Sequence, residues 1–514
     1  MRDSGDGAAP RLTAAAAAIV GVLALLAALA VGHLIAAFVG GGASPYLAVG
    51  DTAVDLTPEW LKDFAIRSFG TADKLVLLLG MALVLLSLAV VAGLASRRGP
   101  MPGVLVIVLM GAIGVVAVLA RPDLGQLALL APVASLLVGG GVFRWLHEWA
   151  LRAQSADTRA QGADTRRRFL GVAAGAGIAG AAGQWLVTRA DPESARRAVG
   201  RLVPVRPARR VPAGAEFAAD GTPTFLTPNA DFYRIDTALV VPRRNTKDWR
   251  LRVHGMVERA LTLSYADLRS RALVERTITL ACVSNPVGGP YVSTANFLGV
   301  DLRDLLHEAG IRPGAEQLLS TSADGFTAGT PIDVVLEADR GSMLALGMNG
   351  EPLPVEHGFP VRMVVPGLYG YVSATKWLTD LEVTTWAARQ GYWIPRGWAR
   401  EAPIKTQSRI DAPASGSRLP AGTVVVAGTA WAPHSGIRRV EVSVDDGPWR
   451  IAELAEQVNV DSWRMWRAEL RLAPGAHRVR CRATDGGGRP QTGTRRPVLP
   501  DGATGWHSVA LHVH

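Results

Sequence analysis

Long apolar stretches without Asp, Glu, Lys or Arg fill the first third of the chain and then stop. Each approaches or exceeds the roughly 17 to 25 residues that a helix needs to cross the hydrocarbon of a bilayer. We therefore expect residues 1–187 to form an all-α transmembrane region of five helices, at about 12–40, 75–95, 101–120, 124–143 and 169–187.

The basic residues between these stretches predict an orientation. Arg97 and Arg98 lie between the second and third spans, and further arginines crowd the segment before the fifth: Arg144, Arg152, Arg159, Arg166, Arg167 and Arg168. Short loops rich in Lys and Arg stay in the cytoplasm. Five crossings then place everything after about residue 187 on the extracytoplasmic side of the cell membrane, in a multi-pass protein with lipid as one partner.

The start of the fifth span carries a second signal. Arg166, Arg167 and Arg168 precede Phe169, Leu170 and a weakly apolar run, a pattern that matches the twin-arginine export signal. The alternative is a plain basic helix end. No cleavage site of the A-x-A type follows closely, so we expect an anchor.

Histidines in the spans are too few for a membrane haem. A transmembrane haem needs axial ligands such as paired histidines. Only His33 lies within a predicted span, and His147 lies just beyond the fourth. We expect no haem.

The pattern changes after the fifth span. Residues 188–222 are rich in Pro, Arg and Ala and predict a linker. From 223 to 400, strand-like runs (250–253, 361–365) alternate with helix-like ones (264–271, 302–309), which predicts an α+β domain. Residues 401–514 alternate with a period of two and predict a β-sandwich; Val440, Val442 and Val444 lead into an Asp445-Asp446-Gly447 turn.

The amino-acid composition changes little in this predicted domain organisation. The net charge of +10 is explained by arginines near the membrane and in the linker, and no nucleic-acid motif is present, so we expect no nucleic-acid partner. Of the two cysteines, Cys481 falls on the apolar face of its predicted strand, so we expect it to lie in the core.

Cys282 is the residue whose side-chain chemistry points most clearly to a function. A thiolate suits a metal that other sulfur donors already hold, although a lone cysteine is also often a buried structural thiol. About eighty residues later come His357, Arg362 and Lys376. A guanidinium and an ammonium suit a buried phosphate, whereas the alternatives are a snorkelling strand arginine and a turn histidine.

These motifs, in this order over residues 229–383, resemble the molybdenum-cofactor domain of the sulfite oxidase family. The resemblance implies one molybdenum–molybdopterin per chain, with Cys282 as the metal ligand and Arg234 as a further catalytic residue. The cofactor-binding residues that it implies are Tyr233, Arg234, Asn285, Ser322, His357, Arg362, Thr375 and Lys376. Residues 401–514 resemble the family's immunoglobulin-like dimerisation domain, which suggests a homodimer.

The implied activity is two-electron oxygen-atom transfer on sulfite or a related small sulfur compound or oxyanion. This sequence departs from true sulfite oxidases: residues 286–289 (Pro-Val-Gly-Gly) stand where an arginine is expected, and Phe326 stands where a tyrosine is expected. A sulfoxide reductase of the same fold and a metal-free, membrane-tethered binding protein therefore remain alternatives. No cytochrome b5 signature is present, so an external electron carrier, a cytochrome or a quinone system, is expected.

Overall fold

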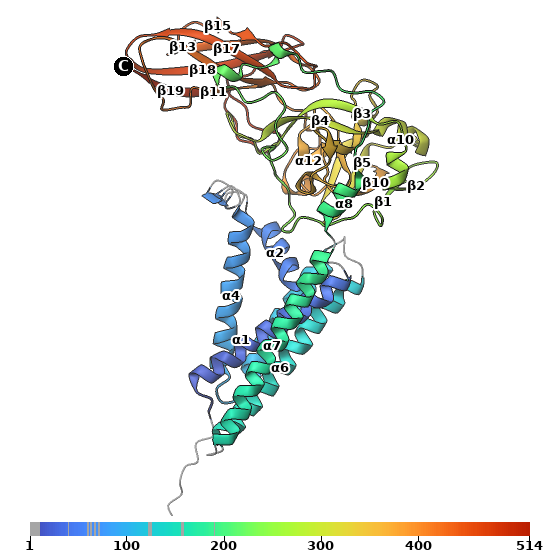
Figure 1. Ribbon diagram of the computed structural model, residues 1–514, viewed down its shortest axis with the longest axis vertical. Helices are drawn as coiled ribbons and strands as arrows, with labels where there is room; N and C mark the ends of the chain where they lie inside the picture. Colours follow the sequence, from blue (N-terminus) through green and yellow to red (C-terminus); the bar gives the residue numbers. More distant parts are fainter. Residues whose placement is uncertain are drawn as a thin grey trace, which may run out of the picture. The chain divides into compact units, whose positions relative to one another are not determined.

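The computed structural model describes residues 11–39, 41–58, 61, 64–65, 68–69, 72–121, 126–155, 159–189 and 191–514. It forms two compact units, the first made of residues 1–190 with 238–240 and the second of 191–237 with 241–514. Helices build the first unit, and sheets dominate the second (Figure 1).

The helical unit contains α1 (Ala14–Val39), α2 (Pro45–Leu56), α4 (Asp73–Ala95), α5 (Met101–Leu119), α6 (Leu130–Ser155) and α7 (Arg159–Arg189). Five helical stretches are long and apolar enough to cross a membrane: 14–39, 73–95, 101–119, 126–154 and 166–186. Each predicted span falls on one of them.

Two helices are longer than predicted, and α2 was not predicted. Helix α6 continues past residue 143 to Ser155, so His147 lies inside it, and the Nε2 atom of His147 is 2.6 Å from the Ser96 carbonyl oxygen. Helix α7 begins ten residues before the predicted start. Side-chain contacts stabilise the polar extensions of these two helices. Arg168 of α7 pairs with Asp164 at 3.0 Å, and its guanidinium lies 3.8 Å from the ring centroid of Trp149 on α6.

Helix α1 is central in this unit and packs against α4, α6 and α7. Its contact with α4 depends on small residues. A Cβ atom on Gly21 would lie 2.0 Å from the Ala89 carbonyl oxygen, and one on Gly93 would lie 2.0 Å from that of Ala17. Small residues spaced by four on both helices thus allow the two backbones to approach closely.

The second unit begins with residues that the sequence suggested were a linker. Helix α8 (Pro192–Val199) opens it, and Val199, Leu202 and Ala215 are buried in its core. The backbone of Val205 donates to Leu273, and Glu275 donates to Arg206. Much of the range 191–222 is therefore packed against the α+β part.

One mixed and one antiparallel sheet form the α+β part. The first has the order β2-β1-β10-β5-β6, with β1 parallel to β10, and the second has the order β3-β4-β7-β8, with β9 also paired to β7. The strands are β1 (Arg250–Gly255), β2 (Leu261–Ser264), β3 (Val274–Ala281), β4 (Val292–Asp301), β5 (Gln317–Ser322), β6 (Thr327–Pro331), β7 (Met343–Met348), β8 (Glu351–Pro352), β9 (Arg362–Val364) and β10 (Leu378–Thr384). The helices are α9 (Tyr265–Arg269), α10 (Leu302–Ala309), α11 (Ile332–Leu336) and α12 (Gly370–Ser373).

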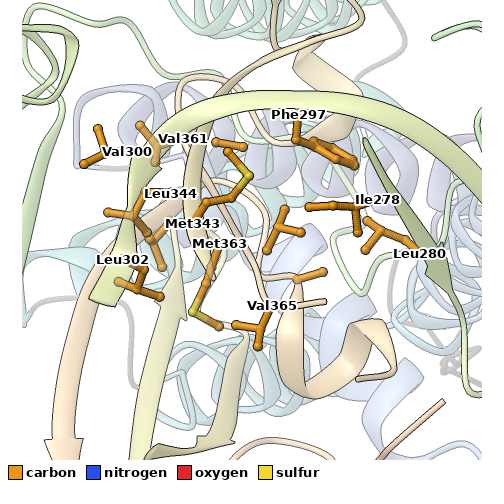
Figure 2. Packing of buried hydrophobic residues seen from close by; sticks show 14 of the residues in the cluster. Ile278, Leu280, Phe297, Val300, Leu302, Met343, Leu344, Val361, Met363 and Val365 are labelled. Atoms are coloured by element: carbon orange, nitrogen blue, oxygen red, sulfur yellow. The ribbon is translucent and has the colours of Figure 1, made fainter. Parts of the chain in front are cut away.

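The core of this part lies against the second sheet. Figure 2 shows Ile278, Leu280 and Phe297 from β3 and β4 packed near Met343 and Met363 from β7 and β9. All five are 1% exposed or less, so strands β3 and β9, which lead to Cys282 and carry Arg362, are rigidly held.

The C-terminal part consists of two sheets around a separate core. One has the order β11-β13-β17-β16 and the other β12-β19-β18-β14-β15. The strands are β11 (Gln407–Ala412), β12 (Arg418–Leu419), β13 (Gly422–Trp431), β14 (Ile437–Val444), β15 (Arg450–Ile451), β16 (Glu453–Leu454), β17 (Arg464–Leu472), β18 (Gly475–Asp485) and β19 (His507–Val513). Two of the three residues of the predicted turn, Asp445 and Asp446, have positive φ, and Cys481 is buried as a free thiol.

Candidate active site

Cys282 follows directly after β3 and begins a loop that returns to β4. Its backbone N–H donates to the Tyr291 carbonyl at 3.0 Å, which closes the loop at its base. The residue as a whole is partly exposed. Burial raises the pKa of the Cys282 thiol, while hydrogen bonds from Ser284 and the charge of Lys376 oppose that rise.

Strand β3 is held on both edges. One edge pairs with β4, and the other bonds to the C-terminal part, where Thr279 N–H donates to the Asp461 carbonyl at 2.9 Å. Trp463 N–H donates to the Thr279 hydroxyl at 2.7 Å. The C-terminal part thereby fixes the strand that carries Cys282.

Arg362 is a buried cation on β9 with incomplete pairing. It is 4% exposed, and its Nη atoms reach only the carbonyls of His357 (3.2 Å) and Ala374 (3.4 Å). Its Nε has no partner among the described residues, and the guanidinium lies 5.6 Å from the Phe297 ring centroid. Burial lowers the pKa of Arg362 to about 10. A buried charge without a carboxylate is costly, so this side chain is suited to an anionic ligand.

Lys376 and Arg234 share one carboxylate. The Asp236 Oδ2 atom accepts from Lys376 Nζ at 3.0 Å and from Arg234 Nε at 3.0 Å. The Lys376 side chain is 10% exposed, and burial lowers its pKa to about 8 although Asp236 acts in the opposite direction. Among the described residues, Asp236 is therefore the carboxylate paired with two of the three site cations, Arg234 and Lys376, and Arg362 has no ion pair.

His357 lies beside this cluster at the end of a short 3₁₀ turn, Val355–His357. Its Nε2–H donates to the Asn229 carbonyl at 2.9 Å, and its buried Nδ1 has no partner among the described residues. Burial, followed by the charges of Arg362 and Lys376, lowers the pKa of His357 to about 4. The imidazole is therefore neutral, with an acceptor nitrogen open to a ligand.

Two phenols lie near the thiol. Burial and the Cys282 charge raise the pKa of Tyr233, while Arg362 opposes that rise. A Cβ atom on Gly370 would lie 3.6 Å from the Tyr233 hydroxyl and 3.8 Å from the Ala281 carbonyl, so this hydroxyl lies near the end of β3. Burial likewise raises the pKa of Tyr369, whose hydroxyl accepts from Lys405 N–H at 3.4 Å.

Three further predicted residues, Ser322, Thr375 and Asn285, differ in whether their side chains already have hydrogen-bond partners within the protein. The Ser322 hydroxyl, at the end of β5, is buried and has no partner among the described residues. Thr375 is 1% exposed and bonds Ser320 at 2.7 Å, so its hydroxyl is used within the protein. Asn285 accepts from Tyr291 N–H at 2.9 Å and so shapes the loop after Cys282.

Asp236 and Tyr369 are candidates that sequence reasoning missed. Asp236 stands two residues after Arg234, and its acidic type beside two predicted phosphate-binding cations was a usable signal. Tyr369 stands within the quoted 357–370 motif, yet nothing in the sequence indicates that its ring lies close enough to Cys282 for the thiol to affect its pKa.

Comparison with known proteins defines the class. Residues 238–393 match the family model described as the oxidoreductase molybdopterin binding domain, a range that includes Cys282, His357, Arg362 and Lys376. The chain is thus a molybdenum oxidoreductase.

Its relatives define the family. The chain is 32% identical over 321 residues to the sulfite oxidase of Gallus gallus, covering 53% of this chain and 70% of that protein. It is 30% identical over 373 residues to the mitochondrial sulfite oxidase of Homo sapiens, covering 60% and 67%. The sulfane dehydrogenase SoxCD of Paracoccus pantotrophus shares the fold, with a TM-score of 0.50 and 22% identity over 59% of this chain and 87% of that chain. The chain belongs to the sulfite oxidase family.

The side chains present fit the family's cofactor. Three buried polar atoms at the site, Arg362 Nε, His357 Nδ1 and Ser322 Oγ, have no protein partner in the described part of the chain. The cations outnumber the close carboxylate by two, which matches a phosphate group of roughly −1.5 to −2 charge. The free thiol of Cys282 supplies a donor for a soft metal.

Proposed function

We propose that this enzyme oxidises sulfite or a closely related sulfur oxyanion at molybdenum held by Cys282. The observation that carries the proposal is the free Cys282 thiol near a buried cationic cluster: the charge of Lys376 acts on the thiol, and Arg362 has an unpartnered Nε among the described residues. The named activities of the relatives from Gallus gallus and Homo sapiens support the substrate class.

The residues divide the work as follows. Cys282 would hold the metal as a thiolate, Arg362 and Lys376 would bind the cofactor phosphate, and His357 would accept a hydrogen bond from the pterin. The neighbouring Asp236 keeps Lys376 and Arg234 in fixed positions, since it accepts from both. Tyr233 keeps its proton because its pKa is raised, and it provides a hydrogen-bond donor near the thiol.

The cofactor, when bound, supplies two-electron oxygen-atom transfer between the metal and the substrate sulfur. The overall reaction balances as sulfite plus water giving sulfate, two protons and two electrons. The electrons are proposed to leave to an external carrier, a cytochrome or a quinone system, because the sequence carries no cytochrome b5 signature.

We further propose that the first unit is a membrane anchor. Five helical stretches of suitable length and apolar composition support this role. By the basic-residue pattern, the second unit lies outside the cytoplasm, and Arg166 to Arg168 act as an uncleaved twin-arginine signal. The two-sheet C-terminal part is proposed to be an immunoglobulin-like domain that supports a homodimer.

Reduction of a small neutral sulfoxide is the second candidate function. It is favoured by the absence of a cation at residues 286–289 and by the contact that ties Arg234 to Asp236 at 3.0 Å. A neutral substrate needs no additional cation, whereas a dianion does.

Metal analysis and turnover on the full-length protein in detergent test both candidates. The first proposal expects about one molybdenum per chain and sulfite-dependent reduction of ferricyanide, as the family resemblance implies for a single cofactor site. The Cys282→Ser variant is expected to lose turnover, with Cys481→Ser as the matched control. A folded, cofactor-supplied protein without molybdenum would instead support a binding function, and methionine sulfoxide reduction without sulfite oxidation would support the second candidate.

A further inference from the structure

The loop that follows Cys282 is rich in glycine and proline. It runs through Pro286, Gly288, Gly289 and Pro290 before it returns to β4 at Val292. Inside it, Gly289 N–H donates to the Pro286 carbonyl at 2.8 Å, and the Asn285 side chain accepts from Tyr291. Glycines lose more backbone entropy on folding than other residues, so such a loop needs outside contacts to keep one conformation.

A C-terminal arginine supplies one of those contacts. Arg409 lies on β11, and its Nη1 donates to the Gly289 carbonyl at 2.9 Å. Its Nε is held by Asp411 Oδ1 at 2.6 Å, and the two side chains are only 13% and 12% exposed. A guanidinium already oriented by a carboxylate loses little further freedom when it bonds the loop, so the contact is rigid.

A C-terminal histidine supplies the second contact. A Cβ atom on Gly288 would lie 2.1 Å from Cδ2 of His507, and Gly288 has a φ of +78°. Only glycine fits this position, for both steric and conformational reasons. His507 is itself fixed, because its Nδ1 accepts from Ile410 N–H at 3.0 Å, which leaves the ring proton on Nε2.

We propose that the C-terminal part completes the substrate site: Arg409 and His507 clamp residues 286–290 and so set the approach to Cys282. Both are positioning residues, acting through the loop and not on the substrate itself. The loop is where the family's arginine is missing, and the clamp fixes a glycine-rich backbone in its place. The effect on the KM for sulfite rests on the proposed function, whereas the rigidity of the loop can be measured by hydrogen exchange without any substrate.

Hydrogen exchange and kinetics on the full-length, cofactor-loaded enzyme test this clamp. Arg409→Met keeps a long unbranched side chain and removes the hydrogen-bond donor. We expect amides in 284–291 to exchange at least about tenfold faster, as for the loss of one charge-assisted hydrogen bond, and the KM for sulfite to rise by a similar factor while kcat changes little. Arg409→Lys should restore part of both. The control is Arg471→Met on β17, an exposed arginine of the same sheet.

A second variant guards against misfolding, because Arg409→Met leaves the buried Asp411 without its partner. His507→Ala removes the ring beside Gly288 and leaves the Arg409–Asp411 pair intact, and the same loop-specific rise in exchange is expected. Unchanged exchange of 284–291 in both folded variants would overturn the proposal, even if KM changed. If the wild-type enzyme showed no sulfite turnover, the proposed function would fail, and exchange alone would still decide the clamp.

Discussion

Lys376 and Asp236 are 140 residues apart in the chain, yet Lys376 Nζ donates to Asp236 Oδ2 at 3.0 Å. The same oxygen also accepts from Arg234. One carboxylate therefore holds two of the three site cations. It partly offsets the burial that lowers the pKa of Lys376 to about 8.

Asp236→Asn should reduce cofactor retention. Without the carboxylate, the pKa of Lys376 falls further below about 8, and both cations lose their fixed position. We expect the molybdenum-to-protein ratio to fall about fivefold to tenfold, equivalent to roughly 1–1.4 kcal/mol of binding. Asp380→Asn, which breaks a more exposed pair with Arg252 and a contact with His254 outside the site, should retain full metal content. Equal metal loss in both variants would refute the specific role of Asp236.

Arg362→Met should have opposite effects on the two forms of the protein. In cofactor-loaded preparations the metal content should collapse, because the buried phosphate loses its guanidinium. In cofactor-free protein the free energy of unfolding should rise by about 1–4 kcal/mol, since a buried, poorly paired charge is replaced by an apolar side chain. Thermal unfolding of both forms checks this. Arg276→Met, whose arginine pairs with Asp301 at 3.0 Å, should not stabilise the cofactor-free protein.

His434 should make stability depend on pH. Its hydrogen bond to Asp461 raises its pKa above the ordinary 6.5. The stabilisation is complete below the unfolded-state pKa and is lost as pH rises through the folded-state pKa. We expect His434→Asn, which tolerates the positive φ here, to lower stability by up to about 1 kcal/mol at pH 5.5 and much less at pH 9. Denaturation midpoints at the two pH values measure it, and an equal loss at both would contradict it.

Gly21→Leu should separate α1 from α4. A Cβ atom at Gly21 meets the backbone carbonyl of Ala89 at 2.0 Å, and backbone cannot rotate away as a side chain can. We expect a loss of about 1–3 kcal/mol, the usual cost of overpacking, seen as a lower midpoint of thermal unfolding in detergent. Gly171→Leu on α7, where no atom lies within 4 Å of the added Cβ, is the matched control and should be nearly neutral.

Much of the architecture could be predicted from the sequence because its signals are local. Long uncharged runs identified all five candidate spans, and the period of two identified β14, β17 and β18. Helix α10 was predicted to the residue, since its apolar spacing and its Asp301 cap stand together in the chain. The ends of α6 and α7 were missed, because their polar continuations depend on contacts such as that of Arg168 with Trp149.

The candidate site was likewise predictable only in part from the sequence. The sequence alone determined which residue types are available: the thiol of Cys282, the cations Arg234, Arg362 and Lys376, and the acceptor His357. Only the tertiary structure decided that Asp236 pairs with two of these cations and that His507 contacts Gly288. Such pairs depend on how sheets close and on which strand edges meet, and a one-dimensional pattern of apolar and polar positions carries no information about that closure.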